Sequence, residues 1–307
     1  MRYTDTDKKV VVFGEVLFDV FPNGNSVIGG APFNVACHLK GFGLNPMLIS
    51  RIGNDRLGKK VIHEMNRREL DQSGMQIDAK YPTGRVEVEI KDNEPSYTIK
   101  KNTAWDYIEK DASIRDRLAK GGMFYHGSLA ARHPVSRETL EDYLQMKTEN
   151  FCDLNLRPPW WTKDCINSLL EKITHLKLNL EELKVVSGEN VQVKDLSEKI
   201  KMILKRFNLR SLVVTMGNKG ALAVKENGEE EKRRAPEVKD FTDSVGAGDA
   251  FAAVMILNIL KKSEMKDTLR NAVDFAAEIC RVRGAVPKNE GLYRKTTNSW
   301  EKRDGSG

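Results

Sequence analysis

Short apolar segments rich in β-branched residues alternate with amphipathic, helix-like segments along most of this chain. Helices are predicted at 31–42, where Pro32 suits the first turn, and at 57–65, where apolar residues share one face after Asp55. The apolar segments predict strands at 10–13, 47–52, 123–126, 151–154, 184–187, 212–216 and 222–224. This alternation is typical of an α/β fold with a mostly parallel central sheet flanked by helices. Ligands of such sheets bind at the carboxyl ends of the strands.

One segment departs from the alternation. Residues 85–91 alternate strictly between polar and apolar, 92–95 form a predicted turn, and Tyr97 and Ile99 continue a second strand. The pattern predicts an antiparallel hairpin with one dry face, which must cover another surface. We interpret it as part of a small antiparallel β-lid, inserted from about 16–28 and 82–105 into a single α/β domain spanning 1–307. The lid is expected to cover the active site, a second subunit in a homodimer, or both.

Composition excludes several classes of protein. Hydrophobic residues make up 40% of the 307, enough for a packed core, but no apolar run has transmembrane length. The four cysteines lack CxxC spacing and the polar start 1–9 does not resemble a signal peptide, so a cytoplasmic location is expected. The five histidines show no metal-binding spacing. Basic residues, with a net charge of +6, are interleaved with acids, which favours a solvated surface over a nucleic-acid or membrane partner.

Two glycine-containing motifs fall short of the patterns they approach. Residues 53–60 nearly match the phosphate-loop pattern, but a lysine replaces the final hydroxyl and Asp55 puts negative charge where phosphate should lie. A capped helix start is the better interpretation. Residues 246–251 approach a dinucleotide-binding turn, but Phe251 takes the place of its third glycine. That motif also lies too late in the chain to be a first βα turn.

The turn at 243–249 is the strongest functional signal. Gly246, Ala247 and Gly248 carry little or no side chain, and the apolar run after Asp249 predicts a helix. N–H groups of such a turn, at a helix N-terminus, form an anion site. Asp249 would repel a phosphate there, so a base that takes a proton from a hydroxyl attacking a phosphoryl group explains it better. The helix N-terminus is expected to favour the ionised form of Asp249.

A second bare turn, at 29–36, opens the first predicted helix. Gly29 and Gly30 let a ligand approach the backbone, and Asn34 lies in the first turn of the helix. Asp19 follows the first predicted strand, at the ligand-binding end of the sheet. Together, Asp19 and Asn34 suit hydrogen bonding to vicinal hydroxyls. Ordinary helix punctuation is the alternative that these residues alone leave open.

The two turns together resemble the two signatures of the ribokinase-like (PfkB) carbohydrate kinases. Weaker blocks of the family stand in the family's order over nearly the whole chain, at 14–19, 52–58, 153–157, 179–182 and 215–220. Within the family, the Gly-Ala-Pro-Phe-Asn run at 30–34 and Trp105 after the lid are most similar to bacterial fructokinases. The resemblance implies a ribokinase-like fold and an ATP-dependent sugar kinase, with D-fructose converted to fructose 6-phosphate as the first expectation.

The resemblance also implies a role for each matching residue. Asp249 would be the catalytic base, and the anion hole would be Gly246, Ala247 and Gly248. The implied sugar-binding residues are Asp19, Gly29, Gly30, Asn34, Trp105 and Arg157. The implied ATP-binding residues are Asn179, Glu182, Thr215, Gly217, Gly220 and Asn271. Glu182 would organise Mg²⁺ through water, and Asp243 would lie where many members hold a monovalent cation such as K⁺.

Several alternatives stay open on the sequence. The nearest is a kinase of the same fold acting on another sugar or sugar acid, such as ribose or 2-keto-3-deoxygluconate. A non-catalytic sugar sensor is less favoured, because a sensor need not keep Asp249 beside an intact glycine turn. For single residues, Glu182 as a solvated helix residue and Thr215 as an ordinary strand residue are the alternatives to nucleotide contacts.

Overall fold

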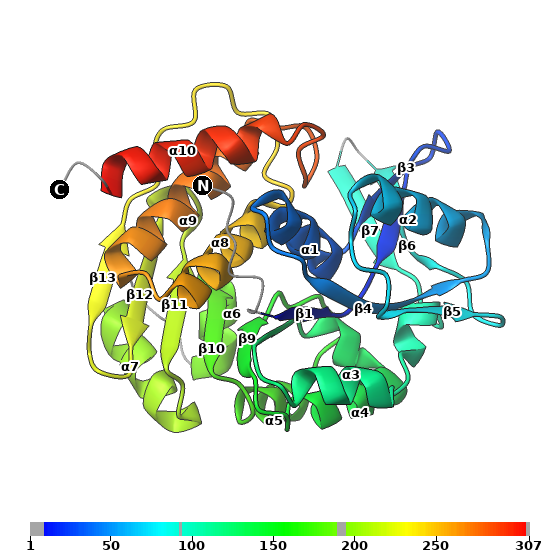
Figure 1. The fold of residues 1–307 in the computed structure, drawn as a ribbon, viewed down its shortest axis with the longest axis horizontal. Coiled ribbons are helices and arrows are strands. Elements are labelled where there is room, and N and C mark those ends of the chain that lie inside the picture. The colour runs from blue at the N-terminus through cyan, green and yellow to red at the C-terminus, as the bar shows by residue number, and fades with distance from the viewer. Residues whose placement is uncertain (1–8, 92–93, 189–194, 305–307) are drawn as a thin grey trace.

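Nine strands form one central sheet in the computed structural model, which describes residues 9–91, 94–188 and 195–304 (Figure 1). The strand order is β13-β12-β11-β10-β9-β8-β1-β4-β5, and every neighbouring pair from β11 to β5 is parallel. Only β12 is antiparallel to its neighbours. The strands are β1 (Val10–Phe13), β4 (Met47–Gly53), β5 (Met75–Asp78), β8 (Met123–His126), β9 (Glu149–Asp153), β10 (His175–Asn179), β11 (Ser211–Thr215), β12 (Ala221–Lys225) and β13 (Glu230–Arg233).

Helices cover both faces of this sheet, each over its own apolar core (Figure 1). One face carries α1 (Ala31–Gly41), α2 (Arg56–Arg67), α8 (Ala247–Lys261), α9 (Met265–Ile279) and α10 (Gly291–Asp304). The other carries α3 (Ala112–Leu118), α4 (Pro134–Tyr143), α5 (Lys163–Leu170), α6 (Leu180–Ser187) and α7 (Leu196–Phe207). The predicted α/β architecture is therefore confirmed. No helix within the described ranges combines the length and the apolar character needed to cross a membrane.

One predicted strand is wrong. Residues 184–187 belong to helix α6, which starts where the Asn179 side chain accepts from the Glu182 N–H and the Glu182 carboxylate accepts from the Asn179 N–H. The strand in this region is β10, which the apolar pattern does not predict because His175, Lys177 and Asn179 interrupt its leucines. A buried lysine in the middle of a strand is unusual.

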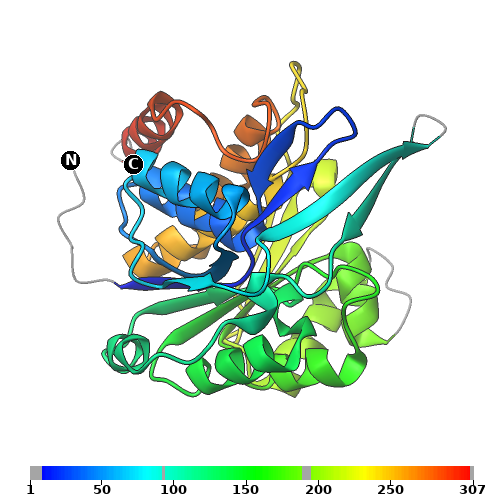
Figure 2. The ribbon, with the colours of Figure 1, turned by 90° about the vertical axis from the view of Figure 1, so that its right-hand side faces the viewer.

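Four further strands form the predicted lid. The lid sheet has the order β3-β2-β6-β7, and its strands are β2 (Leu17–Val20), β3 (Ser26–Gly29), β6 (Gly84–Lys91) and β7 (Glu94–Ile99). The β2–β3 and β6–β7 pairs are antiparallel as predicted, whereas β2 and β6 pair in parallel. Val86 and Val88 are buried while Arg85 and Glu89 are exposed, so the hairpin has its dry face. Figure 2 shows the β6–β7 hairpin extending beyond the body of the protein. Part of the predicted turn, 92–93, lies outside the described residues.

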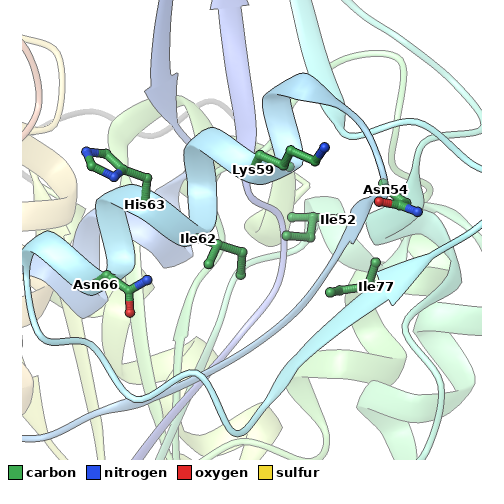
Figure 3. Close-up of a pocket in the computed structure, with 9 residues that line it drawn as sticks. Ile52, Asn54, Lys59, Ile62, His63, Asn66 and Ile77 are labelled. Atoms are coloured by element: carbon green, nitrogen blue, oxygen red, sulfur yellow. The ribbon is translucent and has the colours of Figure 1, made fainter.

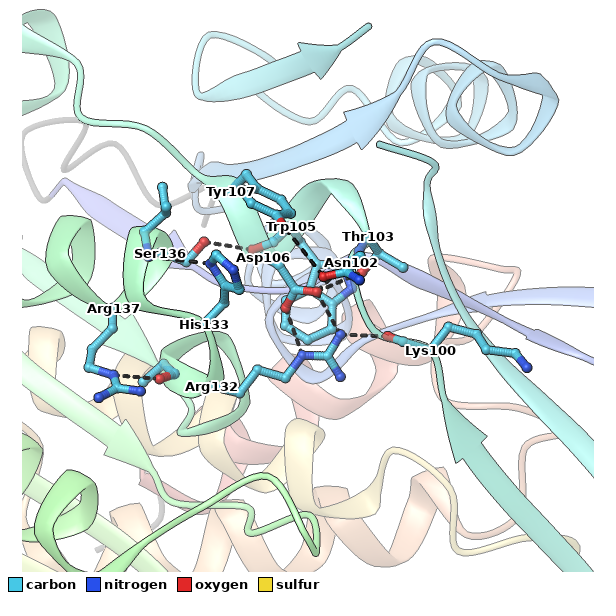
Figure 4. A network of polar contacts seen from close by, with 12 residues as sticks. Lys100, Asn102, Thr103, Trp105, Asp106, Tyr107, Arg132, His133, Ser136 and Arg137 are labelled. Carbon is cyan, nitrogen blue, oxygen red and sulfur yellow. Dashed lines mark hydrogen bonds and ion pairs between the residues drawn. The ribbon is translucent and has the colours of Figure 1, made fainter. Parts of the chain in front are cut away.

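A buried ion pair ties the base of the lid to the body (Figure 4). The Arg132 guanidinium bonds both carboxylate oxygens of Asp106, at 2.6 and 2.8 Å, and donates to the Lys100 carbonyl that follows β7. The same guanidinium lies over the rings of Trp105 and Trp160, at 3.9 and 4.6 Å from their centroids. Such planar, bidentate geometry is available to arginine and not to lysine.

We expect Arg132→Met to lower the free energy of unfolding by about 3–5 kcal/mol, because Asp106 would be left charged and buried without its partner. Urea unfolding followed by circular dichroism measures this loss. The matched control is Lys110→Met, which breaks the exposed Lys110–Glu138 pair and should leave stability nearly unchanged. If the Arg132 variant lost no more than the control, the ion pair would not hold the lid base.

Candidate active site

The structure brings most of the predicted site residues to one edge of the sheet. Parallel neighbours end at the same edge, so the segments after β1, β9, β10 and β11 lie side by side. Arg157 follows β9, Asn179 ends β10 and Thr215 ends β11, whereas Asp19 lies on the lid strand β2, which comes after β1 in the chain. The two predicted turns open α1 and α8, which share one core.

A hydrogen bond joins the two predicted turns. Asn34 Nδ2 donates to Asp249 Oδ2 at 2.8 Å, although the residues are 215 positions apart in the chain. Asn34 lies in the first turn of α1 and Asp249 in the first turn of α8. The predicted sugar-binding side and the predicted base therefore belong to one site.

The Gly246 turn has the geometry of an anion site. Gly246 adopts a left-handed conformation with φ of 78°, and a Cβ there would come within 2.5 Å of the Ala285 Cα, so only glycine fits. Ala247 N–H donates to the Ser244 carbonyl at 3.2 Å, which removes it from the predicted set of free donors. Within the described residues, no partner accepts from the N–H groups of Gly248 and Asp249. These two donors are available to an anion.

The ionisation of Asp249 differs from the sequence-based expectation. Burial raises the pKa of this carboxyl to about 7, and the nearby charge of Asp153 adds to the effect. The hydrogen bond from Asn34 and the positive charges of Lys177 and Arg157 lower the pKa but do not offset burial. The carboxyl is therefore less readily ionised than its place at the helix N-terminus led us to expect, because desolvation is the largest effect on its pKa. The result is a carboxylate more basic than usual and still ionised above neutral pH.

Glu15 is a site residue for which the sequence gives no role. It lies two residues after the end of β1, it is 4% exposed, and its Oε2 has no partner in the part of the chain that the structure describes. The pKa of Glu15 is raised to about 7, mainly by burial and in smaller part by the charge of Asp249, while the charge of Arg157 opposes the rise. The available signal was a glutamate two residues after a wholly apolar strand, at the ligand-binding end of the sheet.

The predicted sugar-binding residues are close together, with one exception. Gly30 has φ of 105°, and a Cβ there would lie 2.4 Å from the Glu15 carbonyl oxygen. A Cβ on Gly29 would be 3.8 Å from Asp19 Oδ2. Burial raises the pKa of Asp19, and the charge of Arg157 lowers it. The Arg157 guanidinium therefore acts on Asp19, Glu15 and Asp249 together.

Trp105 is the exception. Its side chain has no exposed surface, and its ring lies beneath the Arg132 guanidinium at 3.9 Å. A Cβ on Gly84 would come within 2.4 Å of the Trp105 Nε1, so the ring is also packed tightly under the lid strand β6. In this structure Trp105 supports the wall behind the site and does not reach its surface, contrary to the prediction of a sugar contact.

Asn179 and Glu182 are held by one another. Besides their reciprocal bonds at 2.8 and 2.9 Å, Glu182 Oε1 accepts from the Leu156 N–H at 2.9 Å. Glu182 is 5% exposed, so the alternative of a solvated helix residue is wrong. Both of its oxygens already accept backbone N–H groups, which fits a contact to Mg²⁺ through water better than direct ligation. Among the described residues, no cluster of three His, Cys, Asp or Glu side chains could hold a metal ion.

The remaining predicted residues lie on the β11 end and its turn, on the segment before α8, and on α9. The Thr215 hydroxyl donates to the Leu178 carbonyl at 3.3 Å, and Gly217 and Gly220 shape the turn that follows β11. Asp243 Oδ1 accepts from the Val245 N–H at 2.9 Å. Asn271, on α9, is 3% exposed, and its Oδ1 has no partner within the described residues. An unpaired buried acceptor of this kind suits a donor group on a bound ligand, such as an amino group of a nucleobase.

The segment 53–60 is a helix start and no phosphate loop. Asp55 Oδ1 accepts from the Gly58 N–H, and Asp55 Oδ2 accepts from the Thr83 N–H, both at 2.8 Å. Asp55 is thus the N-cap of α2, as the sequence predicts. Figure 3 shows the surface hollow beside it, of about 350 Å³, between α2 and β5. It lies at the far edge strand of the sheet, away from α8.

Comparisons with known proteins agree with this geometry. The fold is the ribokinase-like α/β fold: the aminoimidazole riboside kinase from Salmonella enterica superposes with a TM-score of 0.78 at 20% identity, covering 94% of this chain and 99% of the other. Residues 7–290 match the pfkB family of carbohydrate kinases, so the chain belongs to that family.

Two relatives are more similar in sequence. A fructokinase from Salmonella typhimurium is 28% identical over 267 residues, which cover 82% of this chain and 84% of that protein. A sugar kinase from Pyrococcus horikoshii, solved in complex with ATP, is 26% identical with a TM-score of 0.76, covering 95% of this chain and 99% of the other.

Substitution of Asp249 by Asn should stabilise the protein more at high pH than at low pH. The unfolded carboxyl titrates near 3.8 and the folded one near 7. The unfolded state therefore loses its proton first as the pH rises from about 4 to about 7. Over this range the wild-type protein becomes less stable relative to the Asp249→Asn variant, whose amide does not titrate. We expect the Tm of Asp249→Asn minus that of wild type to be larger at pH 8 than at pH 5. The exposed Asp116→Asn is the control, and a difference independent of pH would contradict the raised pKa.

Proposed function

We propose that this protein is an ATP-dependent sugar kinase that phosphorylates the primary hydroxyl of a small sugar, with D-fructose as the first candidate and fructose 6-phosphate as the product. The observation that carries the proposal is the Asn34–Asp249 hydrogen bond, because it unites a polar sugar-facing turn with a base at an anion site. Membership of the pfkB family supports the kinase, and the similarity to a fructokinase supports the choice of sugar.

The geometry suits direct phosphoryl transfer. The oxygen of the sugar hydroxyl forms a bond to the γ-phosphorus of ATP while the bond from that phosphorus to the β,γ-bridging oxygen breaks. ADP leaves with the electron pair, and the hydroxyl proton goes to Asp249. The free N–H groups of Gly248 and Asp249 offset the charge on the phosphoryl oxygens. Little covalent chemistry is asked of the protein, so positioning and electrostatics supply most of the rate.

Further residues have proposed binding roles. Asp19, Gly29, Gly30, Asn34 and Arg157 would bind the sugar. Glu182 would orient Mg²⁺ through water, which supplies charge neutralisation of the ATP phosphates, and the unpaired Asn271 Oδ1 suits a donor on adenine. The remaining nucleotide contacts would come from Asn179, Thr215, Gly217 and Gly220. Asp243 is the proposed monovalent-cation residue, with K⁺ as the ion.

The identity of the sugar is the part of the proposal that needs testing first. Members of this fold act on different sugars, and the aminoimidazole riboside kinase is one example among the structures similar to this chain. The experiment is a coupled assay of ADP release over D-fructose, ribose, 2-keto-3-deoxygluconate and aminoimidazole riboside. D-fructose should give the highest kcat/KM. A higher value for another sugar would reassign the substrate, and binding of a sugar without turnover would favour the sensor.

Asp249→Asn should lower kcat by about 10²–10⁴-fold, the usual contribution of a general base. The amide still accepts from Asn34, so binding of the sugar and of ADP should be retained. Turnover is measured by ADP release and binding by isothermal titration calorimetry. Exposed Asp116→Asn is again the matched control. Near-normal turnover in the Asp249 variant would remove this residue from the role of base.

A further inference from the structure

Lys177 is a buried charge that the mechanism above does not use. It lies in the middle of β10, directly opposite Asp153 in the register of β9, and its Nζ is 2.7 Å from Asp153 Oδ1. The side chains of Lys177 and Asp153 are 7% and 2% exposed. Well-packed apolar residues often stabilise a core at least as well as a buried ion pair. Stability alone is therefore a weak reason for this pair.

The lysine reaches the anion site. A Cβ placed on Gly248 would lie 3.5 Å from Lys177 Nζ, an ordinary contact distance. Unlike Gly246, Gly248 does not have a positive φ, so its backbone conformation does not require glycine. Because Gly248 has no side chain, the space between the Lys177 ammonium group and the free N–H groups of Gly248 and Asp249 stays open. An anion bound by those donors would lie against Lys177.

The charge balance of the site also calls for a cation there. Asp153, Glu182 and Asp249 all act on Lys177 and raise its pKa, against the effect of burial, so it carries a positive charge at neutral pH. An ammonium group has three N–H donors. Among the described residues, the bond to Asp153 is the one that the Nζ makes. Donors therefore remain for the oxygens of an incoming anion, which the three carboxylates would otherwise repel.

We propose that Lys177 is a catalytic residue that binds the transferring phosphoryl group beside the N–H groups of Gly248 and Asp249. Asp153 orients the ammonium group and keeps it in place between turnovers. This role rests on the proposed kinase function and adds to it a phosphoryl contact that comes from a sheet strand.

The test uses two variants and a control. Lys177→Met alone leaves Asp153 charged and buried, which threatens folding, so the informative variant is the double substitution Lys177→Met with Asp153→Asn. Asp153→Asn alone keeps the lysine and isolates the effect of the aspartate. Lys172→Met is the surface control, since Lys172 precedes the opposite end of β10 and pairs there with Glu141.

The readout is binding of a transition-state mimic by calorimetry. ADP with aluminium fluoride and MgCl₂, in the presence of the best sugar of the panel, should bind wild type, Asp153→Asn and Lys172→Met more tightly than ADP alone. The double variant should lose this gain while its affinity for ADP stays unchanged. Its kcat should fall by about 10²–10³-fold, the scale of one lost anion-stabilising donor, with little change in KM.

The outcomes separate the two proposals. If wild type turns over a sugar and the double variant keeps both the aluminium fluoride gain and its kcat, Lys177 is a structural counter-ion and this inference is wrong, while the kinase stands. Loss of the gain in Asp153→Asn to the same degree as in the double variant would likewise assign the effect to the aspartate. If wild type phosphorylates no sugar, the proposed function fails and the role of Lys177 fails with it.

Discussion

The hydrogen bond from Asn34 to Asp249 is the contact on which the site depends. It forms because α1 and α8 lie on the same face of the sheet and begin at the same edge. Small buried residues, including Ala36, Ala250 and Ala253, belong to the core that the two helices share. Two segments far apart in the sequence thereby become one surface, with the Asn34 side chain on one side and the free N–H groups of Gly248 and Asp249 on the other.

The site contains groups that a stable core normally avoids, namely buried charges and a backbone conformation that favours glycine. Glu15, Asp153, Lys177 and Asp249 are charged or titratable groups that lie close enough to act on one another, and burial raises the pKa values of Glu15 and Asp249 to about 7. Gly246 adopts a conformation open almost only to glycine. A chain shaped by stability alone would replace these features, so their concentration at one edge marks the functional site.

Much of this could be predicted from the sequence, because the signals were local. The alternating segments predicted the α/β sheet, and the strict polar–apolar alternation at 85–91 predicted the lid hairpin. The two glycine-containing turns predicted the two segments that the Asn34–Asp249 bond brings together. Strand β10 could not be predicted, since Lys177 breaks its apolar run and only the register opposite Asp153 explains the charge.

The errors share a physical cause. The pKa of Asp249 and the position of Trp105 depend on burial, which is decided by packing between distant segments. Rules that use only neighbouring residues do not predict burial. The helix dipole alone favours an ionised Asp249, and the position of Trp105 after the lid alone suggests a ligand contact. Desolvation raises the pKa of Asp249, and the Trp105 side chain is enclosed by Arg132 and by the backbone at Gly84.

Above all, we propose that Asp249 is the base and that its burial sets the pH range of catalysis. The most direct measurement is the pH dependence of kcat/KM for the sugar, from about pH 5.5 to 9 at saturating MgATP, for wild type and Asp249→Asn. For wild type we predict a fall that approaches about tenfold per pH unit below the pKa near 7, because the protonated carboxyl cannot accept the hydroxyl proton. The residual kcat/KM of Asp249→Asn should not show this fall below pH 7. If the variant showed the same fall below pH 7, or if kcat/KM of wild type did not change with pH, Asp249 would not be the base.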